Sequence, residues 1–373
     1  MEKEFRYTTL AHRYTARFPV LTYVGTQVNF WIIANILLVT IVHLYSLMLT
    51  EIFDISVAGN YGLMLLIAVI LGLFYGVCMG LIGYYLDRSV FKRFPLGKII
   101  VFKTLLSVVI LVLLLWLVRL VVFNVFTSAT LPLGGLTLNR ETWDYLWYLV
   151  LIYYFAMTLL ISFINQVNKK FGPGVLVPLL LGRYRTPKED ERIFLFMDLK
   201  SSTTTAEKLG HLRYSAFIRD CFADINEVLY PFYAQVYQYV GDEVVVMWPA
   251  SEGLKDHSCL KFYFACRSQF RNRENYYMTN YGFLPIFKAG LHMGKVTVVE
   301  IGEIKREIAY HGDTLNTSAR IQSVCNQYNR DFLVSKYLLE KAGADSTLKF
   351  EPLGMVLLKG KTEMLEIVSV EEN

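Results

Sequence analysis

The sequence predicts an N-terminal all-α transmembrane bundle of four helices, followed by a C-terminal α/β domain. Of the 373 residues, 54% are hydrophobic, and the excess lies in long apolar runs within the first half. The connections between those runs alternate between basic and non-basic, which is typical of a membrane protein with a fixed orientation. From about residue 190 the composition is that of an ordinary globular domain, in which strand and helix patterns follow one another.

The composition indicates where the domains begin and end and which classes of partner to expect. The expected domains are residues 1–26 as a cytoplasmic N-terminal segment, 27–166 as the four-helix transmembrane domain, 167–190 as a juxtamembrane linker and 191–373 as the α/β domain. The net charge of +5 is modest and forms no basic stripe, so we expect no nucleic-acid partner. The five cysteines show no CxxC spacing, and four lie in the half expected to be cytoplasmic, where thiols stay reduced.

Four apolar segments are long enough to cross the hydrocarbon core of a bilayer, which takes about 20 helical residues. They cover residues 27–50, 61–86, 99–126 and 145–164. Lysine and arginine cluster before the first, between the second and third, and after the fourth. We therefore expect a multi-pass protein of the cell (inner) membrane, in contact with the lipid bilayer, with both termini and the C-terminal domain cytoplasmic. Arg13 and Arg17 precede the first segment, so no cleavable signal peptide is expected.

Two ionisable residues fall inside these segments. His43 could ligate a haem or sense a proton, but no other span carries the second histidine that a haem normally takes. A symmetric dimer could supply that ligand, although a structural histidine is the more frequent case. Arg119 is either a functional intramembrane charge or, more often, a side chain that snorkels or pairs within the bundle.

The connection between the two halves is short. Gly172-Pro173-Gly174 predicts the end of the fourth helix just outside the bilayer. The apolar run at 175–181 indicates a short helix, and residues 183–192 are charged and solvated. No heptad repeat extends far enough for a long coiled coil.

The α/β domain opens with a mostly apolar run, 193–197, that ends at Asp198. This pattern predicts a buried strand ending at a carboxylate, followed by a hydroxyl-rich turn with Ser201, Ser202 and Thr203. A carboxylate beside free backbone N–H groups suits a divalent cation that carries phosphates. The alternative is an aspartate that only caps the next helix, a role that the three hydroxyl residues can also fill.

A helix is expected over 206–230, and a β-hairpin over 235–248 with a Gly-Asp turn that places Asp242 at its tip. Asp242 alone is more simply a turn residue. If the hairpin pairs beside the preceding strand, however, Asp198 and Asp242 converge at the ends of adjacent strands. Two acids placed in this way can hold two Mg²⁺ ions about 4 Å apart.

A second helix over 255–271 precedes two further strands, 286–291 and 296–301. A turn over residues 292–295 is expected to join these strands. Lys295 on that turn either meets a phosphate or remains a solvated lysine.

Polar residues of the last third suit a phosphorylated ligand. Asp313 is expected to cap a helix after a glycine turn. Asn316 and Arg320 lie four residues apart in that helix, so they share one face. Arginine offers a planar, permanently charged fork for a phosphorane-like transition state, and asparagine can orient a ribose or a phosphate. The alternative is an ordinary amphipathic helix with exposed polar residues. Lys359 and Lys361 flank a glycine in a later turn that also suits a polyphosphate.

These elements, in this order, resemble the catalytic domain of class III nucleotidyl cyclases over about residues 190–370. The matching motifs are Phe196-Met-Asp198-Leu and Val240-Gly-Asp242 for the metals, Gly290-Leu-His-Met-Gly294 for a glycine-rich strand turn, and Asn316 with Arg320 for the transition state. The resemblance implies an α/β sandwich with a ferredoxin-like core, and it identifies residues 191–373 as a nucleotidyl cyclase catalytic domain.

The same resemblance implies the reaction. The ribose 3′-OH of a nucleoside triphosphate attacks the α-phosphorus and releases pyrophosphate, with two Mg²⁺ or Mn²⁺ ions per active site. The ions would be held by Asp198, Asp242 and the backbone carbonyl of Leu199. The phosphate-binding residues would be Ser201, Ser202, Thr203, Lys295 and Lys359 or Lys361. In this family Asn and Arg reach the site from the partner chain, so Asn316 and Arg320 imply a head-to-tail homodimer with two equivalent sites.

One departure from the family concerns base selection. Adenine-selective members often carry Lys and Asp (or Thr) at positions that here are Gln238 and Ala309, and the guanine-selecting Glu and Cys pair is also missing. Gln can donate to and accept from a base edge, whereas Ala cannot discriminate by hydrogen bonding. We favour ATP, and hence a membrane-bound adenylate cyclase that makes cyclic AMP, because adenylate cyclases dominate the bacterial-looking members with this membrane architecture.

Other functions stay open at this stage. Gln238 and Ala309 are also compatible with a guanylate or pyrimidine nucleotide cyclase. A non-catalytic nucleotide-binding membrane receptor is a second alternative, although such a domain would not need both acids and the Asn316/Arg320 pair. Val240-Gly-Asp-Glu-Val loosely resembles a diguanylate cyclase loop, but the Asn/Arg pair and the lysine turn do not fit that family.

Overall fold

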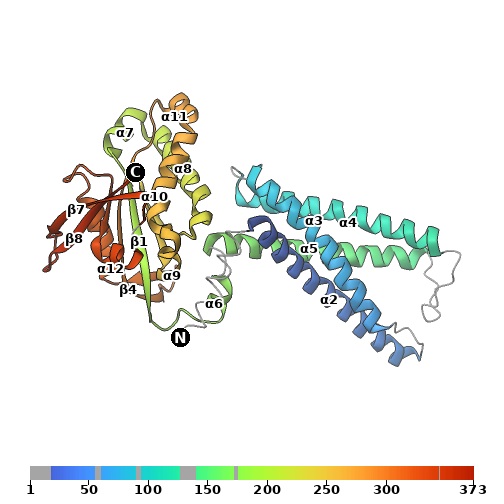
Figure 1. The fold of residues 1–373 in the computed structure, drawn as a ribbon. Coiled ribbons are helices and arrows are strands. Elements are labelled where there is room, and N and C mark those ends of the chain that lie inside the picture. The colour runs from blue at the N-terminus through green and yellow to red at the C-terminus, as the bar shows by residue number, and fades with distance from the viewer. Residues whose placement is uncertain (1–17, 55–59, 90–93, 127–139, 172–174, 344) are drawn as a thin grey trace. The chain divides into compact units, whose positions relative to one another are not determined.

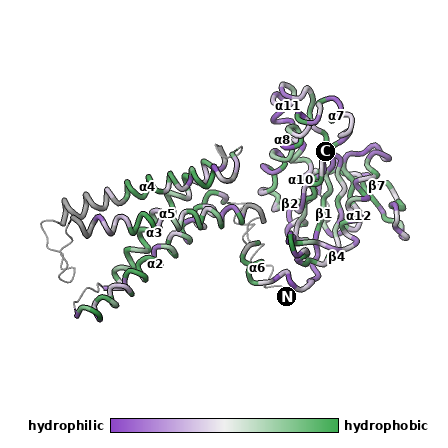
Figure 2. The backbone as a smooth tube through the Cα atoms, turned by 180° about the vertical axis from the view of Figure 1, so that it is seen from behind, coloured by the Kyte–Doolittle hydropathy of each residue, from purple (hydrophilic) through white to green (hydrophobic). Residues whose placement is uncertain are grey.

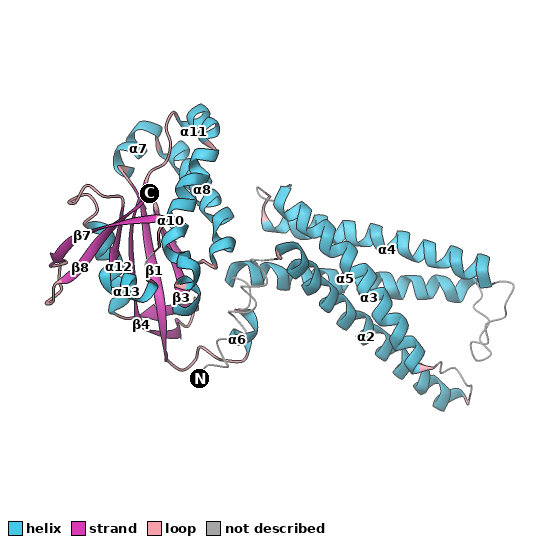
Figure 3. Cartoon of the chain, in the orientation of Figure 1, coloured by secondary structure: helices cyan, strands magenta, loops and turns pink. Residues whose placement is uncertain are grey.

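The computed structural model describes residues 18–54, 60–89, 94–126, 140–171, 175–343 and 345–373. The described chain divides into two compact units, Phe18–Leu176 and Val177–Asn373. Each unit has a hydrophobic core of its own. The first is helical and the second combines helices with a sheet, so the predicted succession of folds is confirmed (Figure 3).

Long apolar helices make up the first unit. They are α2 (Pro19–Phe53), α3 (Tyr61–Ser89), α4 (Leu96–Phe126) and α5 (Arg140–Phe171). Among the described residues, four helices are long and apolar enough to cross a membrane, as the sequence predicts. Hydrophobic residues follow these helices along most of their length (Figure 2). The first helix begins at Pro19 and not near residue 27, because proline fits the first turn of a helix, where its missing N–H leaves no bond unmade.

Glycines let α2 and α3 approach closely. A Cβ added to Gly76 would lie 2.5 Å from the Cα of Val28, and one added to Gly72 would lie 2.7 Å from the Cα of Ile32. Small residues at this spacing allow close backbone packing in a bilayer, where the hydrophobic effect does not drive helices together.

Polar side chains lie within the apolar bundle. Lys103 of α4 forms a buried ion pair with Asp87 of α3, with Nζ 2.8 Å from Oδ1. His43 stacks on Tyr61, with ring centroids 4.6 Å apart, which supports the structural interpretation of His43. The side chain of Arg119 lies outside the described residues.

The second unit is built on one mixed sheet with helices against it (Figure 1). Its elements are α6 (Leu176–Leu180), β1 (Lys188–Leu199), α7 (Ser202–Leu209), α8 (His211–Leu229), η2 (Tyr230–Phe232), β2 (Gln235–Val240), β3 (Glu243–Pro249), α9 (Ala250–Gly253), η3 (Lys255–His257), α10 (Ser258–Asn272), α11 (Glu274–Tyr281), β4 (Phe287–Ile301), β5 (Glu307–His311), α12 (Asp313–Ser323), β6 (Phe332–Ser335), α13 (Lys336–Ala342), β7 (Leu348–Val356) and β8 (Leu365–Glu372).

The strand order identifies the core of this sheet. The sheet runs β2-β3-β1-β4-β6-β8-β7, and β5 pairs with β4. Along the chain, β1, α8, β2, β3, α10 and β4 follow the βαββαβ succession, and these strands lie in the order β4-β1-β3-β2. This is the ferredoxin-like core that the resemblance implies.

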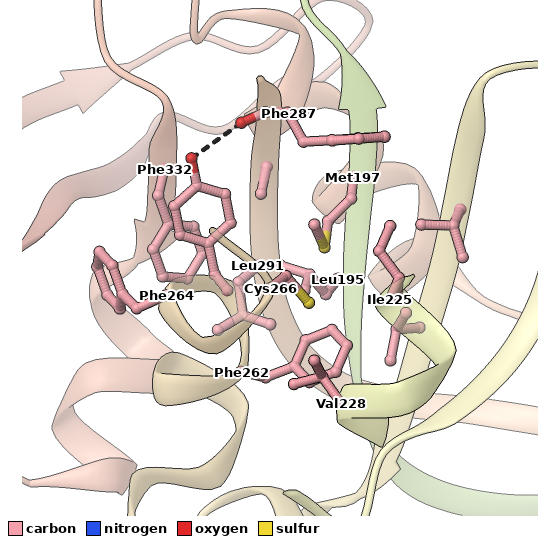
Figure 4. Packing of buried hydrophobic residues seen from close by; sticks show 14 of the residues in the cluster. Leu195, Met197, Ile225, Val228, Phe262, Phe264, Cys266, Phe287, Leu291 and Phe332 are labelled. Atoms are coloured by element: carbon pink, nitrogen blue, oxygen red, sulfur yellow. Dashed lines mark hydrogen bonds between the residues drawn. The ribbon is translucent and has the colours of Figure 1, made fainter. Parts of the chain in front are cut away.

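The two faces of β1 have different surroundings. Side chains alternate along a strand, and the alternate residues Leu195 and Met197 are buried in the main core with α8 and α10. Figure 4 shows them among core side chains that include Ile225 and Phe262. Asp198 has the other parity, so it points to the opposite face of the sheet, where α12 packs.

Two glycines of β4 let α12 lie directly on that face. A Cβ at Gly290 would be 2.2 Å from the backbone nitrogen of Gln322. A Cβ at Gly294 would be 2.6 Å from Oγ1 of Thr314. The helix that carries Asn316 and Arg320 can therefore pack closely on β4, because Gly290 and Gly294 have no side chains.

The expected turn over residues 292–295 is wrong, because β4 runs unbroken from Phe287 to Ile301. Gly290 and Gly294 suggest a turn from sequence alone, but neither has a positive φ in the structure. They serve helix packing, a role that depends on α12 and cannot be read from the strand itself.

Two predicted helix boundaries also differ. The single helix expected over 206–230 is interrupted at Gly210, whose φ of +72° ends α7 before α8 begins. The helix cap expected at Asp313 lies instead at Gly312, so Asp313 is the first residue of α12. Its carboxylate therefore contacts other groups, which are described below.

Candidate active site

Strand pairing brings Asp198 and Asp242 together. β1 runs antiparallel to β3, and Asp198 lies opposite Glu243, the first residue of β3. Asp242 immediately precedes Glu243 in the turn of the β2–β3 hairpin, where Gly241 has a φ of +62°. The structure thus contains the predicted convergence of two carboxylates at the ends of adjacent strands.

The two aspartates belong to a partly buried, negatively charged cluster. Burial, and then the charge of Asp242, raise the pKa of Asp198. Burial and the charges of Asp198 and Asp242 raise the pKa of Glu243 to about 7. Lys288 opposes both shifts, and its Nζ lies 3.3 Å from Oδ2 of Asp198. Lys288 brings one positive charge to a cluster of three carboxyl groups, so a bound cation would stabilise their charged forms.

The cluster fits a divalent cation. Oδ2 of Asp242 is buried and has no hydrogen-bond partner in the described part of the chain. Mg²⁺ prefers oxygen ligands and usually takes only one or two carboxylates from the protein, the rest of its shell being water and substrate phosphates. Among the described residues, no group of three or more His, Cys, Asp or Glu side chains is arranged to hold a metal. Leu199 ends β1 next to Asp198. Its hydrocarbon side chain has no atom that binds a metal, so only its backbone carbonyl could be a ligand.

A hydroxyl-rich turn and a tyrosine border the two acids. Ser201 has a left-handed φ of +56°, and Ser202 and Thr203 begin α7. Burial and the charges of both aspartates raise the pKa of Tyr214 to about 12, while a hydrogen bond with Ser202 lowers it. Tyr214 of α8 therefore lies within electrostatic reach of both aspartates. In the sequence, Tyr214 is only one of the residues on the buried face of a predicted helix. The hydrophobic pattern gives no signal that this tyrosine interacts with the two aspartates.

Asn316 and Arg320 share one face of α12, as predicted. Asn316 is exposed and Arg320 is half-buried, whereas Thr317 and Ser318 are buried against the sheet. The Asn/Arg pair consequently points away from the sheet of its own chain.

Lys295 lies far from the acids along β4. It pairs with Glu191, whereas Lys288 of the same strand pairs with Asp198. The two lysines are seven residues apart, which corresponds to roughly 23 Å along a strand. The Lys295 side chain is 80% exposed, and its Nζ lies 4.0 Å from Glu189. The structure therefore does not bring Lys295 to the acids of its own chain, and the turn expected to present it to a phosphate does not form.

The turn over residues 359–361 lies against α12. Gly360 has a φ of +73°, and a Cβ there would lie 3.2 Å from Nη2 of Arg320. Lys359 is exposed. Lys361 donates a hydrogen bond to Asp313, so this second lysine of the predicted phosphate pair is engaged by a carboxylate of its own chain.

The two expected base-selecting positions flank a pair of tyrosines. Gln238 is exposed and pairs with Val245, whereas Ala309 is buried. Their neighbours Tyr237 and Tyr310 contact each other, with ring centroids 5.2 Å apart. Sequence reasoning missed this contact, because β2 and β5 lie far apart in the chain and do not pair with each other.

The second unit is similar in sequence to known proteins. Residues 185–369 match the adenylate and guanylate cyclase catalytic domain. Adenylate cyclase 2 of Rhizobium meliloti (strain 1021) is 35% identical over 221 residues, which cover 59% of this chain and 61% of that protein. Adenylate cyclase 1 of the same organism is 27% identical over 183 residues, or 47% of this chain and 27% of that protein. The chain thus spans less than two thirds of both relatives.

A solved structure has the same fold. A bacterial light-regulated adenylyl cyclase superposes with a TM-score of 0.50 at 19% identity, covering 58% of this chain and 63% of that one. The family match begins three residues before β1 and ends within β8, so it includes β1, the β2–β3 hairpin and α12, which contain Asp198, Asp242 and the Asn/Arg pair. Residues 185–369, just under half of the chain, are thus similar in sequence to the adenylate and guanylate cyclase catalytic domain.

Proposed function

We propose that this protein is a membrane-bound adenylate cyclase that converts ATP to cyclic AMP and pyrophosphate. The observation that carries the proposal is the pair of carboxylates, Asp198 and Asp242, at adjacent strand ends, with a buried oxygen of Asp242 that accepts no hydrogen bond from the described residues. A buried carboxylate oxygen without a partner costs free energy unless a cation or a proton satisfies it. A metal–nucleotide complex supplies that cation.

Each group has a role in the reaction. Asp198, Asp242 and the carbonyl of Leu199 would hold two Mg²⁺ or Mn²⁺ ions, which supply Lewis-acid activation of the hydroxyl and of the triphosphate. In the reaction itself, the ribose 3′-oxygen bonds to the α-phosphorus, the bond to the β-phosphate oxygen breaks, pyrophosphate leaves and the hydroxyl proton passes to solvent. Arg320 stabilises the charge that develops on the α-phosphate, and Asn316 orients the ribose.

The direction of the Asn/Arg pair supports a homodimer. Asn316 and Arg320 point away from the sheet of their own chain, and a helix face with these groups suits a site across an interface. In a head-to-tail dimer each chain lends its α12 to the acids of the other, which gives two equivalent sites. Lys295, remote from the acids of its own chain, would bind phosphate only if it served the site of the partner.

Two kinds of observation bear on which base the site would select. ATP is supported by the names of the two similar curated proteins, both adenylate cyclases. A guanylate or pyrimidine nucleotide cyclase is the second candidate, because exposed Gln238 can bond to more than one base edge and buried Ala309 offers no polar atom in its side chain.

The membrane half supports a location in the bilayer. The four apolar helices and the charges of their connections favour a multi-pass protein of the cell membrane with a cytoplasmic catalytic domain. Tethering the chain in a membrane also raises the local concentration of catalytic domains, which favours the dimer that the site requires.

The test uses purified full-length protein with Mn²⁺ and each of ATP, GTP, CTP and UTP in turn. We expect cyclic AMP as the main product. Cyclic GMP or a cyclic pyrimidine nucleotide as the main product would replace the proposed substrate and retain the reaction. A protein that binds nucleotide but forms no cyclic product from any of the four would be a binding receptor.

A further inference from the structure

An ion pair joins the first residue of α12 to the turn over residues 359–361. Nζ of Lys361 donates to Oδ2 of Asp313, and the same oxygen accepts a hydrogen bond from Oγ1 of Thr317 at 3.2 Å. The Lys361 side chain is the less exposed partner, at 22% against 68% for Asp313. The contact links residues 48 apart in the chain and connects the helix of Arg320 to the turn of Lys359.

The same turn packs against the guanidinium group. The left-handed φ of Gly360, +73°, places its backbone where a Cβ would lie 3.2 Å from Nη2 of Arg320. The backbone N–H of Lys361 donates to the carbonyl of Leu358 at 3.0 Å and closes the turn. Leu358 is buried in a small core with Ile321 of α12. The turn is thus fixed to α12 at its base by Leu358 and beyond Gly360 by the ion pair.

We propose that Lys361 is a positioning residue and does not bind phosphate. Its ion pair with Asp313 holds the turn against α12, and this places the guanidinium of Arg320 and the ammonium of Lys359 for the triphosphate. The inference rests on the proposed cyclase activity for its kinetic part only. It assigns different roles to Lys359 and Lys361, which the sequence presents as equivalent.

The size of the expected effect distinguishes positioning from catalysis. A largely exposed ion pair stabilises a conformation only weakly, so its loss should lower kcat by a factor of about 3 to 10. Removal of a group that touches the reacting phosphate should cost about 100-fold or more. Asp313→Asn is the informative variant, because it breaks the ion pair and leaves Lys361 in place.

The experiment measures kcat and KM for full-length Asp313→Asn, Lys361→Met and the double variant. If the ion pair acts as a unit, the two single variants lose similar activity and the double variant is no worse than either. Asp313→Glu, which keeps the charge, should recover most of the rate. If Lys361 binds phosphate, Lys361→Met is far more damaging, and Asp313→Asn is neutral or faster; that result would overturn the proposal.

A second readout does not depend on activity. Hydrogen exchange of residues 357–364 in the nucleotide-free, full-length protein should be faster in Asp313→Asn than in the natural protein. The matched control is Lys336→Met, which removes a similar exposed ion pair with Glu366 at 2.7 Å and should leave exchange in the turn unchanged. Faster exchange without any cyclase activity would refute the proposed function and keep the positioning contact. Unchanged exchange in Asp313→Asn would refute the contact itself.

Discussion

Nε2 of Gln322 donates a 3.2 Å hydrogen bond to Oδ2 of Asp198. This bond ties the last turn of α12 to the end of β1, whereas Asn316 and Arg320, six and two residues earlier in the same helix, point away from the sheet. One face of α12 therefore contacts an acid of its own chain, and the opposite face presents the Asn/Arg pair.

The carboxylate pair gives the first prediction. Asp198→Ala and Asp242→Ala should each lower cyclic nucleotide formation by about 100-fold, because one acid alone holds a divalent cation weakly. The rate is measured on the full-length protein at saturating Mn²⁺. Glu303→Gln, at an exposed acid of the same domain, is the control and should leave the rate unchanged. A loss of less than threefold in Asp242→Ala would remove that residue from the site.

Mixing variants tests the shared site. Asp198→Ala and Arg320→Ala should each be nearly inactive, but a heterodimer of the two keeps one intact site. Co-expression in equal amounts should therefore restore about a quarter of the natural activity, since half of the dimers carry one of two sites. The matched control mixes Asp198→Ala with Asp242→Ala, which damages both sites of the heterodimer and should restore nothing. Equal recovery in both mixtures would contradict a site built across the interface.

The glycines under α12 give a stability prediction. Gly290→Ala forces a Cβ against the backbone of Gln322, where nothing flexible can move aside, and should destabilise the domain by about 1–3 kcal/mol. Gly294→Ala should cost less, because the nearest atom is the rotatable Oγ1 of Thr314. Unfolding can be followed with a thiol-reactive dye, because Cys221, Cys259, Cys266 and Cys325 are buried. A Cys78→Ser background removes the thiol of the membrane unit. The reverse order of the two costs would contradict the packing described for α12.

Glu243 should make the metal-free protein less stable as the pH rises. Its pKa of about 7 in the folded protein exceeds the ordinary value of 4.5, so between these values the folded state holds a proton that the unfolded state has lost. Stability then falls as the pH rises through this window. Glu243→Gln should flatten the slope in part, because Asp198 also has a raised pKa and contributes in the same direction. The unfolding midpoint of chelator-treated protein across this window is the measurement; the same slope in both proteins would show that Glu243 does not hold the proton.

The sequence predicted the acid pair because its signals are local. An apolar run ending at Asp198 and a Gly-Asp turn at Asp242 each have a direct backbone consequence, and pairing of adjacent strands does the rest. The four apolar helices could also be predicted from the sequence, since the length and hydropathy of a segment are enough to identify a candidate membrane-spanning helix.

Contacts between distant segments account for what the sequence did not show. From sequence alone, Gly290 and Gly294 suggest a turn. In the structure they give room for α12, and β4 runs through both glycines as one continuous strand. Tyr214 of α8 and the two aspartates come from separate elements, and only the folded chain brings their charges close enough to raise the pKa of the tyrosine. The role of Lys361 depends on Asp313, 48 residues away, and no local pattern marks that pairing.

The most direct test of the account measures cyclic AMP and pyrophosphate together, from ATP and Mn²⁺, with the full-length protein and with Asp242→Asn. The account predicts that the natural protein forms both products in equal amounts and that Asp242→Asn, which keeps the shape of the side chain but not its charge, forms almost none. Equal rates for the two proteins, or pyrophosphate without any cyclic AMP, would contradict it.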